Sequence, residues 1–100
     1  MNNTSRAKTD IEVREEFLSK LRELAIYWAN TEGTTSLEKC EGVVFSILNI
    51  FDGTSCGLPA MDISLSPHES DKEYAIEKSE NWYESGMVIN NTMMHEKFYV

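Results

Sequence analysis

The chain has 100 residues, of which 41% are hydrophobic and 26% are charged, and its formal net charge is −8 at pH 7. This composition indicates a folded domain and excludes a disordered chain, which has too few apolar groups to offset the entropy lost on ordering. No basic cluster is present, so we expect no direct binding to nucleic acid. No apolar run approaches the roughly 18 residues needed to cross a bilayer. The polar first nine residues lack the apolar core of a signal peptide, and we expect a cytoplasmic protein that does not enter a membrane.

The polar composition of residues 1–9 predicts a flexible tail, and residues 10–100 are expected to form one globular domain. A helix is predicted over residues 10–30, with Thr9 or Asp10 as its N-cap. Its apolar residues recur at spacings of seven, three, four and three, which is typical of an amphipathic helix. The stripe consists of Ile11, Leu18, Leu21, Ala25 and Trp28.

The next segment, residues 36–52, admits two interpretations. Ser36 is a suitable cap for a helix whose stripe would be Leu37, Cys40, Val44, Ile47 and Phe51. Residues 43–51 are also rich in β-formers and precede Asp52-Gly53, so a strand that turns into a hairpin is the alternative. The length and regular spacing of the stripe favour the helix. In that helix Cys40 is expected in the core, and Gly42 is expected to allow close approach of another element.

The C-terminal half predicts shorter elements. Residues 60–65 alternate apolar and polar, which predicts a strand with Met61, Ile63 and Leu65 facing inward. Ser70 and Glu73 form a capping-box pattern that opens a short helix near residues 70–80. A second strand is predicted at 87–90. The chain would then continue either as a short helix capped by Asn91 or Thr92, or as a strand over 95–100.

The predicted fold class is therefore α+β. Two long antiparallel helices, residues 10–30 and 36–52, pack against a small sheet of two or three strands built from 60–65 and 87–90. The short helix near 70–80 connects those strands. Because two strands make a weak sheet, helix packing must carry the stability, and a homodimer that extends the sheet is consistent with this pattern.

Catalytic and metal-binding motifs are absent from the sequence, and no cofactor is expected. The alternative is a small metal-dependent or cysteine enzyme that uses His68, His95 and Cys56, since imidazole and thiolate groups bind zinc and carry out nucleophilic chemistry. Nothing in the spacing of these residues shows that they converge. We therefore interpret the histidines as surface or loop residues and the cysteines as reduced thiols, with a disulfide between them as the alternative.

An acidic and aromatic segment, residues 69–84, is the candidate binding region. We expect it to dock on a protein partner with a basic surface, which includes nucleic-acid-binding proteins, because acidic groups steer encounters and tryptophan anchors interfaces. The candidate residues are Glu69, Asp71, Glu73, Glu77, Glu80, Trp82, Tyr83 and Glu84. Taken singly, the residues favour a simpler interpretation, in which the acidic groups form a solvated face, Trp82 fills the bottom of a small core and Tyr83 is half exposed.

Overall fold

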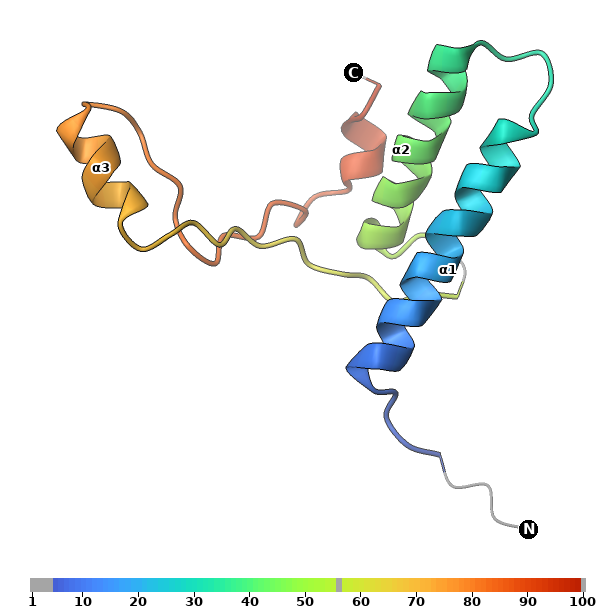
Figure 1. Ribbon diagram of the computed structural model, residues 1–100, viewed down its shortest axis with the longest axis horizontal. Helices are drawn as coiled ribbons and strands as arrows, with labels where there is room; N and C mark the ends of the chain where they lie inside the picture. Colours follow the sequence, from blue (N-terminus) through green and yellow to red (C-terminus); the bar gives the residue numbers. More distant parts are fainter. Residues whose placement is uncertain (1–4, 56, 100) are drawn as a thin grey trace. The chain divides into compact units, whose positions relative to one another are not determined.

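The computed structural model describes residues 5–55 and 57–99. Within these residues the chain forms three α-helices and one 3-10 helix (Figure 1): α1 spans Asp10–Ala29, α2 spans Ser36–Asp52, α3 spans Asp71–Glu77, and the 3-10 helix spans Met94–Lys97. The chain divides into two compact units, residues 1–47 and 48–100, and α2 contributes residues to both. The expectation of a tail over 1–9 and of a single domain over 10–100 stays a prediction.

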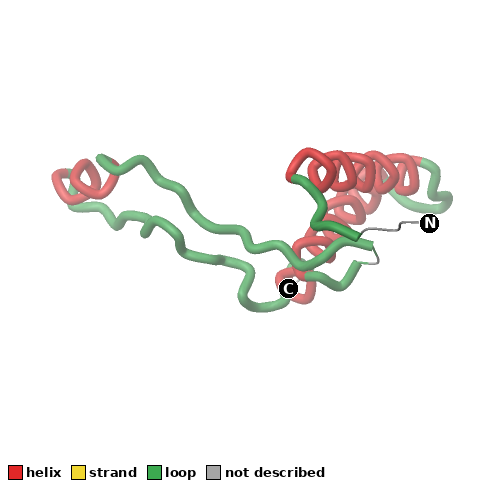
Figure 2. Tube along the Cα trace, turned by 90° about the horizontal axis from the view of Figure 1, so that it is seen from below, coloured by secondary structure: helices red, strands yellow, loops and turns green. Residues whose placement is uncertain are grey.

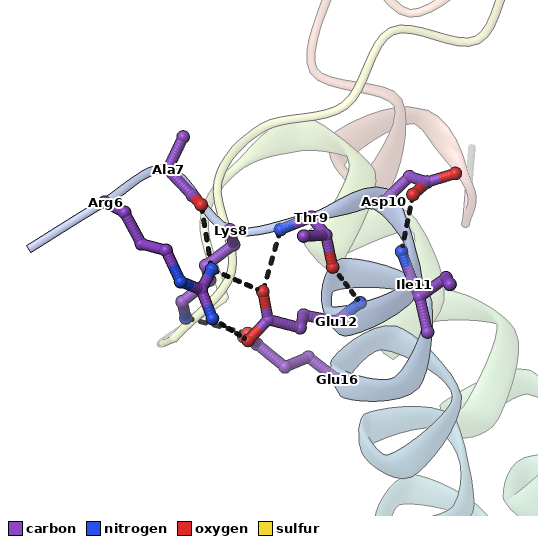
Figure 3. A network of polar contacts seen from close by, with 8 residues as sticks. All are labelled: Arg6, Ala7, Lys8, Thr9, Asp10, Ile11, Glu12 and Glu16. Atoms are coloured by element: carbon purple, nitrogen blue, oxygen red, sulfur yellow. Dashed lines mark hydrogen bonds and ion pairs between the residues drawn. The ribbon is translucent and has the colours of Figure 1, made fainter.

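A capping box starts α1, as Figure 3 shows. The Glu12 backbone amide donates to Thr9 Oγ1 at 3.2 Å, and the Thr9 backbone amide donates to Glu12 Oε1 at 2.9 Å. Arg6 donates to both Glu12 carboxylate oxygens, at 2.7 and 3.0 Å. The Arg6 hydrogen bonds and the Thr9 amide lower the pKa of Glu12 to about 2. The predicted start of the helix is thus confirmed, with Thr9 as the N-cap and a carboxylate where the helix dipole favours negative charge.

In the first unit, the Trp28 ring of α1 lies directly against Gly42 of α2. A Cβ atom at Gly42 would lie 2.5 Å from the Trp28 ring atoms Cδ2 and Cε3, so only glycine leaves room for the indole. The indole Nε1 donates to Ser46 Oγ at 3.0 Å. The expected close approach at Gly42 is confirmed.

Helix α1 carries two overlapping apolar rows. The row that is half-buried in the structure differs from the predicted stripe. The half-buried row has spacings of four, four, three and four and consists of Val13, Phe17, Leu21, Leu24 and Trp28. In contrast, Ile11, Leu18 and Ala25 are exposed. The predicted stripe was wrong at these three positions, because periodicity shows that apolar rows exist and not which of them packs.

The helical interpretation of residues 36–52 is confirmed, and the strand alternative is wrong. The predicted cap at Ser36 is wrong, because Thr35 makes the capping hydrogen bonds with Glu38, at 3.0 and 3.1 Å. The predicted stripe is nevertheless exposed in its first half, at Leu37, Cys40 and Val44, so the core position expected for Cys40 is wrong as well. The row that contains Gly42 and Ser46 faces Trp28 instead. The Trp28 indole can lie against α2 only where α2 has no side chain, which is at Gly42. The row of α2 that contains Gly42 therefore faces α1 in place of the predicted apolar stripe.

The predicted sheet is wrong, and with it the α+β fold class. Figure 2 shows helices and loops without a strand in the part of the chain that the structure describes. The segments expected as strands, 60–65 and 87–90, run side by side but share one isolated antiparallel bridge, between Ser64 and Val88. Across this bridge the Leu65 amide donates to the Met87 carbonyl oxygen, and the Ile89 amide donates to the Ile63 carbonyl oxygen, each at 2.9 Å.

The ladder ends after one bridge because both of the next pairing positions are occupied by other groups. The Ile63 amide donates to the side-chain oxygen of Asn90 at 2.8 Å instead of to a backbone carbonyl. The Leu65 carbonyl accepts from the amide of Gly86 at 2.8 Å, where a positive φ of 81° turns the chain. The alternation predicted for 60–65 persists without a sheet, since Met61, Ile63 and Leu65 are half-buried.

The chain returns to a helix near its C-terminal end, which agrees with the first of the two interpretations. Met94–Lys97 is a 3-10 helix, and the strand predicted as the alternative over 95–100 is not formed at the described residues 95–99. The N-cap is Met93 and makes no side-chain hydrogen bond, so the predicted cap at Asn91 or Thr92 was wrong.

Asn90 joins the end of α2 to the two paired segments. Its Nδ2 donates to the Met61 carbonyl at 2.6 Å and lies 3.4 Å from the Phe51 carbonyl, while its Oδ1 accepts from the Ile63 amide.

We expect Asn90→Ala to lower the free energy of unfolding by about 2 kcal/mol, because the part-buried Ile63 amide and Met61 carbonyl lose their partner. Urea unfolding would measure this. The matched control is Asn91→Ala at an exposed neighbour, and equal midpoints for the two variants would contradict the role of Asn90.

Few side chains of the described residues are fully covered. Ile50 and Ala75 are the buried hydrophobic residues, and Asp52 is the buried charged one. The stability of each unit therefore rests largely on half-buried contacts and on specific hydrogen bonds.

Among the described helices, none combines the length and the apolarity needed to cross a membrane.

Candidate functional site

The predicted binding region, residues 69–84, is built around α3. The start of this helix is fixed locally by His68, whose backbone amide donates to Asp71 Oδ2 at 3.0 Å. The Ser70 amide donates to His68 Nδ1 at 3.2 Å. Ser70 is the N-cap but makes no side-chain capping bond, so the predicted capping box with Glu73 was wrong. His68 thus has a structural role at the entrance of the helix.

Most of the apolar surface in this segment faces solvent. Ala75 is its one buried residue, while Tyr74, Ile76 and Tyr83 have exposed fractions of 62%, 53% and 76%. Large exposed aromatic and aliphatic side chains are enriched at interaction surfaces.

The charges of the segment are arranged so that the negative ones remain accessible. It holds six carboxylates and two lysines, for a net charge of −4. Lys72 Nζ lies 4.9 Å from the centre of the Trp82 ring, and Lys78 Nζ lies 5.3 Å from the centre of the Tyr74 ring. Among the described residues, no ion pair within 4.0 Å involves any of the six carboxylates. Both lysines lie over rings, and all six acidic residues are exposed, although Asp71 and Glu84 each also accept a hydrogen bond within the segment.

Trp82 does not fill a core. Its side chain is 40% exposed, its Nε1 donates to Glu84 Oε1 at 3.0 Å, and Lys72 lies over its face. The interpretation of Trp82 as a core residue is wrong. These contacts limit the orientations of the indole while a large part of it stays accessible, and a restricted side chain loses less entropy when a partner covers it.

The structure brings together one polar pair that sequence reasoning missed, Asp52 with His95. Asp52 Oδ2 accepts from the His95 backbone amide at 2.8 Å and lies 2.7 Å from His95 Nδ1. The Asp52 side chain has no exposed surface, and that of His95 is 15% exposed. Burial raises the pKa of Asp52, but the His95 backbone and ring hydrogen bonds and the Met94 backbone outweigh it, so the pKa lies below its usual value. Nothing in the sequence pattern marks this contact, because 43 residues separate its members.

The alternative of an enzyme that uses His68, His95 and Cys56 gains no support from the geometry. His68 bonds to Ser70, and His95 bonds to Asp52, so the two imidazoles have different neighbours. Cys56 lies outside the described residues, and its expected role stays a prediction. Within residues 5–55 and 57–99, no group of three or more His, Cys, Asp or Glu side chains is placed to hold a metal ion.

The first unit contains an open pocket of about 190 Å³ between α1 and α2. It is lined by Ala25, Trp28, Ala29, Lys39, Cys40 and Val43. This volume is below the roughly 300 Å³ at which small-molecule sites begin. Because both residues line this pocket, Ala25 and Cys40 lie on the same side of the helix pair.

Comparisons with protein-family models, with curated proteins and with solved structures find no match for this chain. Function must therefore be inferred from the residues and their geometry.

Proposed function

We propose that this chain is a non-enzymatic interaction module that docks on a protein partner through residues 69–84. The observation that carries the proposal is the combination of exposed aromatic side chains with carboxylates that form no ion pair among the described residues. The chemistry of the partner follows from this surface, which requires basic groups around an apolar recess.

In the proposed mechanism, the negative charge attracts the partner and the aromatic side chains form the contact. The net charge of −4 attracts a basic partner over a distance of about one Debye length, which is about 8 Å at physiological salt. Trp82 and Tyr83 then supply contact area at low entropic cost. Arginine or lysine side chains of the partner would pair with Glu73, Glu77 and their neighbours.

We expect site-specific photo-cross-linking in cells to identify the partner at this surface. A photoreactive residue at Tyr83 should give a discrete adduct, whereas the same residue at Tyr27, which is 63% exposed on α1, should not. The adduct should disappear in the variant Glu73→Gln, Glu77→Gln, Glu80→Gln. The control variant Glu23→Gln, Glu32→Gln, Glu41→Gln removes the same charge elsewhere and should retain it.

Binding measurements with the purified chain and the purified partner would then give the change in affinity. Affinity for the cross-linked partner should fall by at least about tenfold with the triple substitution in the segment, and by a similar factor as salt rises from 0.15 M to 0.5 M. Equal adducts at Tyr83 and Tyr27, or an affinity that 0.5 M salt leaves unchanged, would refute docking through this segment.

A further inference from the structure

The exposed apolar row of α1 forms a second surface, separate from the acidic segment. Ile11, Leu18 and Ala25 recur every seven residues, and the first two are each 56% exposed. Side chains seven apart lie on nearly the same face of a helix. The pocket bounded by Ala25 and Cys40 borders this face, so the row lies beside the contact with α2 and not within it.

Two opposite charges flank the row at positions related by symmetry. Glu15 precedes Leu18 by three residues, and Arg22 follows it by four. Neither makes an ion pair within 4.0 Å in the part of the chain that the structure describes, whereas Arg14 pairs with Asp10 at 3.7 Å. Seven residues separate Glu15 from Arg22, or about 10 Å along the helix axis, which is too far for a direct pair within one helix.

We infer that this face binds the α1 helix of a second copy of the chain, in antiparallel orientation about a two-fold axis at Leu18. Such an axis places Leu18 against the partner's Leu18, and Ile11 against the partner's Ala25. It also brings Glu15 beside the partner's Arg22, twice in each dimer. Isologous contacts have this reciprocal form, in which one residue meets another and the other meets the first.

Charge complementarity therefore identifies the occupant as a second copy. The contact runs along a helix of 20 residues, which is about 30 Å long. One helix pair lies at the low end of the area that stable interfaces bury, so we infer a dimer that dissociates on dilution.

The test is a measurement of molar mass by sedimentation across a concentration series of the full chain. The wild-type chain should change from monomer to dimer as its concentration rises. Leu18→Glu places two carboxylates at the axis and should weaken the dimer by at least about tenfold. The control Ser19→Glu adds the same charge about 100° around the helix and should leave dimerisation nearly unchanged. Circular dichroism shows whether each variant remains helical.

A mixing experiment tests the charge pairing without altering the apolar row. Arg22→Glu and Glu15→Arg each place like charges opposite each other in a homodimer, so each variant alone should be mostly monomeric. Mixed together, they restore two attractive pairs and should form a heterodimer. A monomeric wild-type chain at every concentration, a dimer insensitive to Leu18→Glu, or no heterodimer on mixing would overturn the inference. These outcomes do not depend on the partner of the acidic segment.

Discussion

Replacing Gly42 with alanine is expected to lower the free energy of unfolding by about 2 kcal/mol, although alanine is the better helix former. The intrinsic gain in a helix is about 1 kcal/mol. Against it stands the new Cβ, which would lie 2.5 Å from the rigid Trp28 ring and must displace it. Overpacking of this kind costs about 1–3 kcal/mol. Displacing the ring also strains the hydrogen bond to Ser46, which is worth about 1 kcal/mol, so the losses exceed the gain by about 2 kcal/mol.

A double-mutant cycle with Trp28→Ala provides the control. In that background the obstacle is gone, so Gly42→Ala should become neutral or stabilising. Chemical unfolding of the four proteins would measure the coupling. If Gly42→Ala has the same effect with and without the tryptophan, the contact does not determine the choice of glycine.

Asp52→Ala is expected to cost about 3 kcal/mol at neutral pH, since it removes a buried carboxylate that accepts two hydrogen bonds from His95. The pKa of Asp52 is lowered in the folded chain, so its ionised form stabilises the fold. This contribution is present above the unfolded-state pKa, near pH 4, and is lost as the pH falls further through the folded-state pKa.

Unfolding of the wild-type chain and the variant between pH 3 and pH 7 would test both statements. The difference in stability should be largest at neutral pH and should shrink below about pH 4. Asp62→Ala serves as the control, because that residue is exposed. A difference that stays constant down to pH 3 would show that the ionised carboxylate is not what stabilises the fold.

The helices were predictable from local signals. Thr9 and Glu12 form the capping box that begins α1, and the regular apolar spacing after Ser36 outweighed the β-formers at 43–51. These signals lie within one or two turns of the chain, where hydrogen bonding and propensity act directly.

The sheet could not be predicted, because its absence depends on a distant side chain. The alternation at 60–65 fits a strand, and the burial pattern follows it. Asn90 and Gly86 nevertheless take the hydrogen-bonding positions that would extend the ladder, and neither residue lies in the alternating segment. The faces of α1 and α2 were misjudged for a related reason, since one close approach at Gly42 selects the rows that meet.

The candidate site was predictable in composition but not in arrangement. The sequence shows six carboxylates near two rings, yet only the structure places Lys72 over Trp82 and Lys78 over Tyr74. The Asp52–His95 pair had no local signal at all. Side-chain contacts across such separations depend on how the loops return, which periodicity does not encode.

The end of α2 has a consequence for the order of events during synthesis. The Asp52 carboxylate accepts its hydrogen bonds from His95, which comes 43 residues later in the chain. A nascent chain that has not yet reached residue 95 therefore lacks the hydrogen-bond donors of a carboxylate that is buried in the complete fold. The second unit must complete its folding late in translation, and a product that terminates before residue 90 should be a substrate for proteolysis.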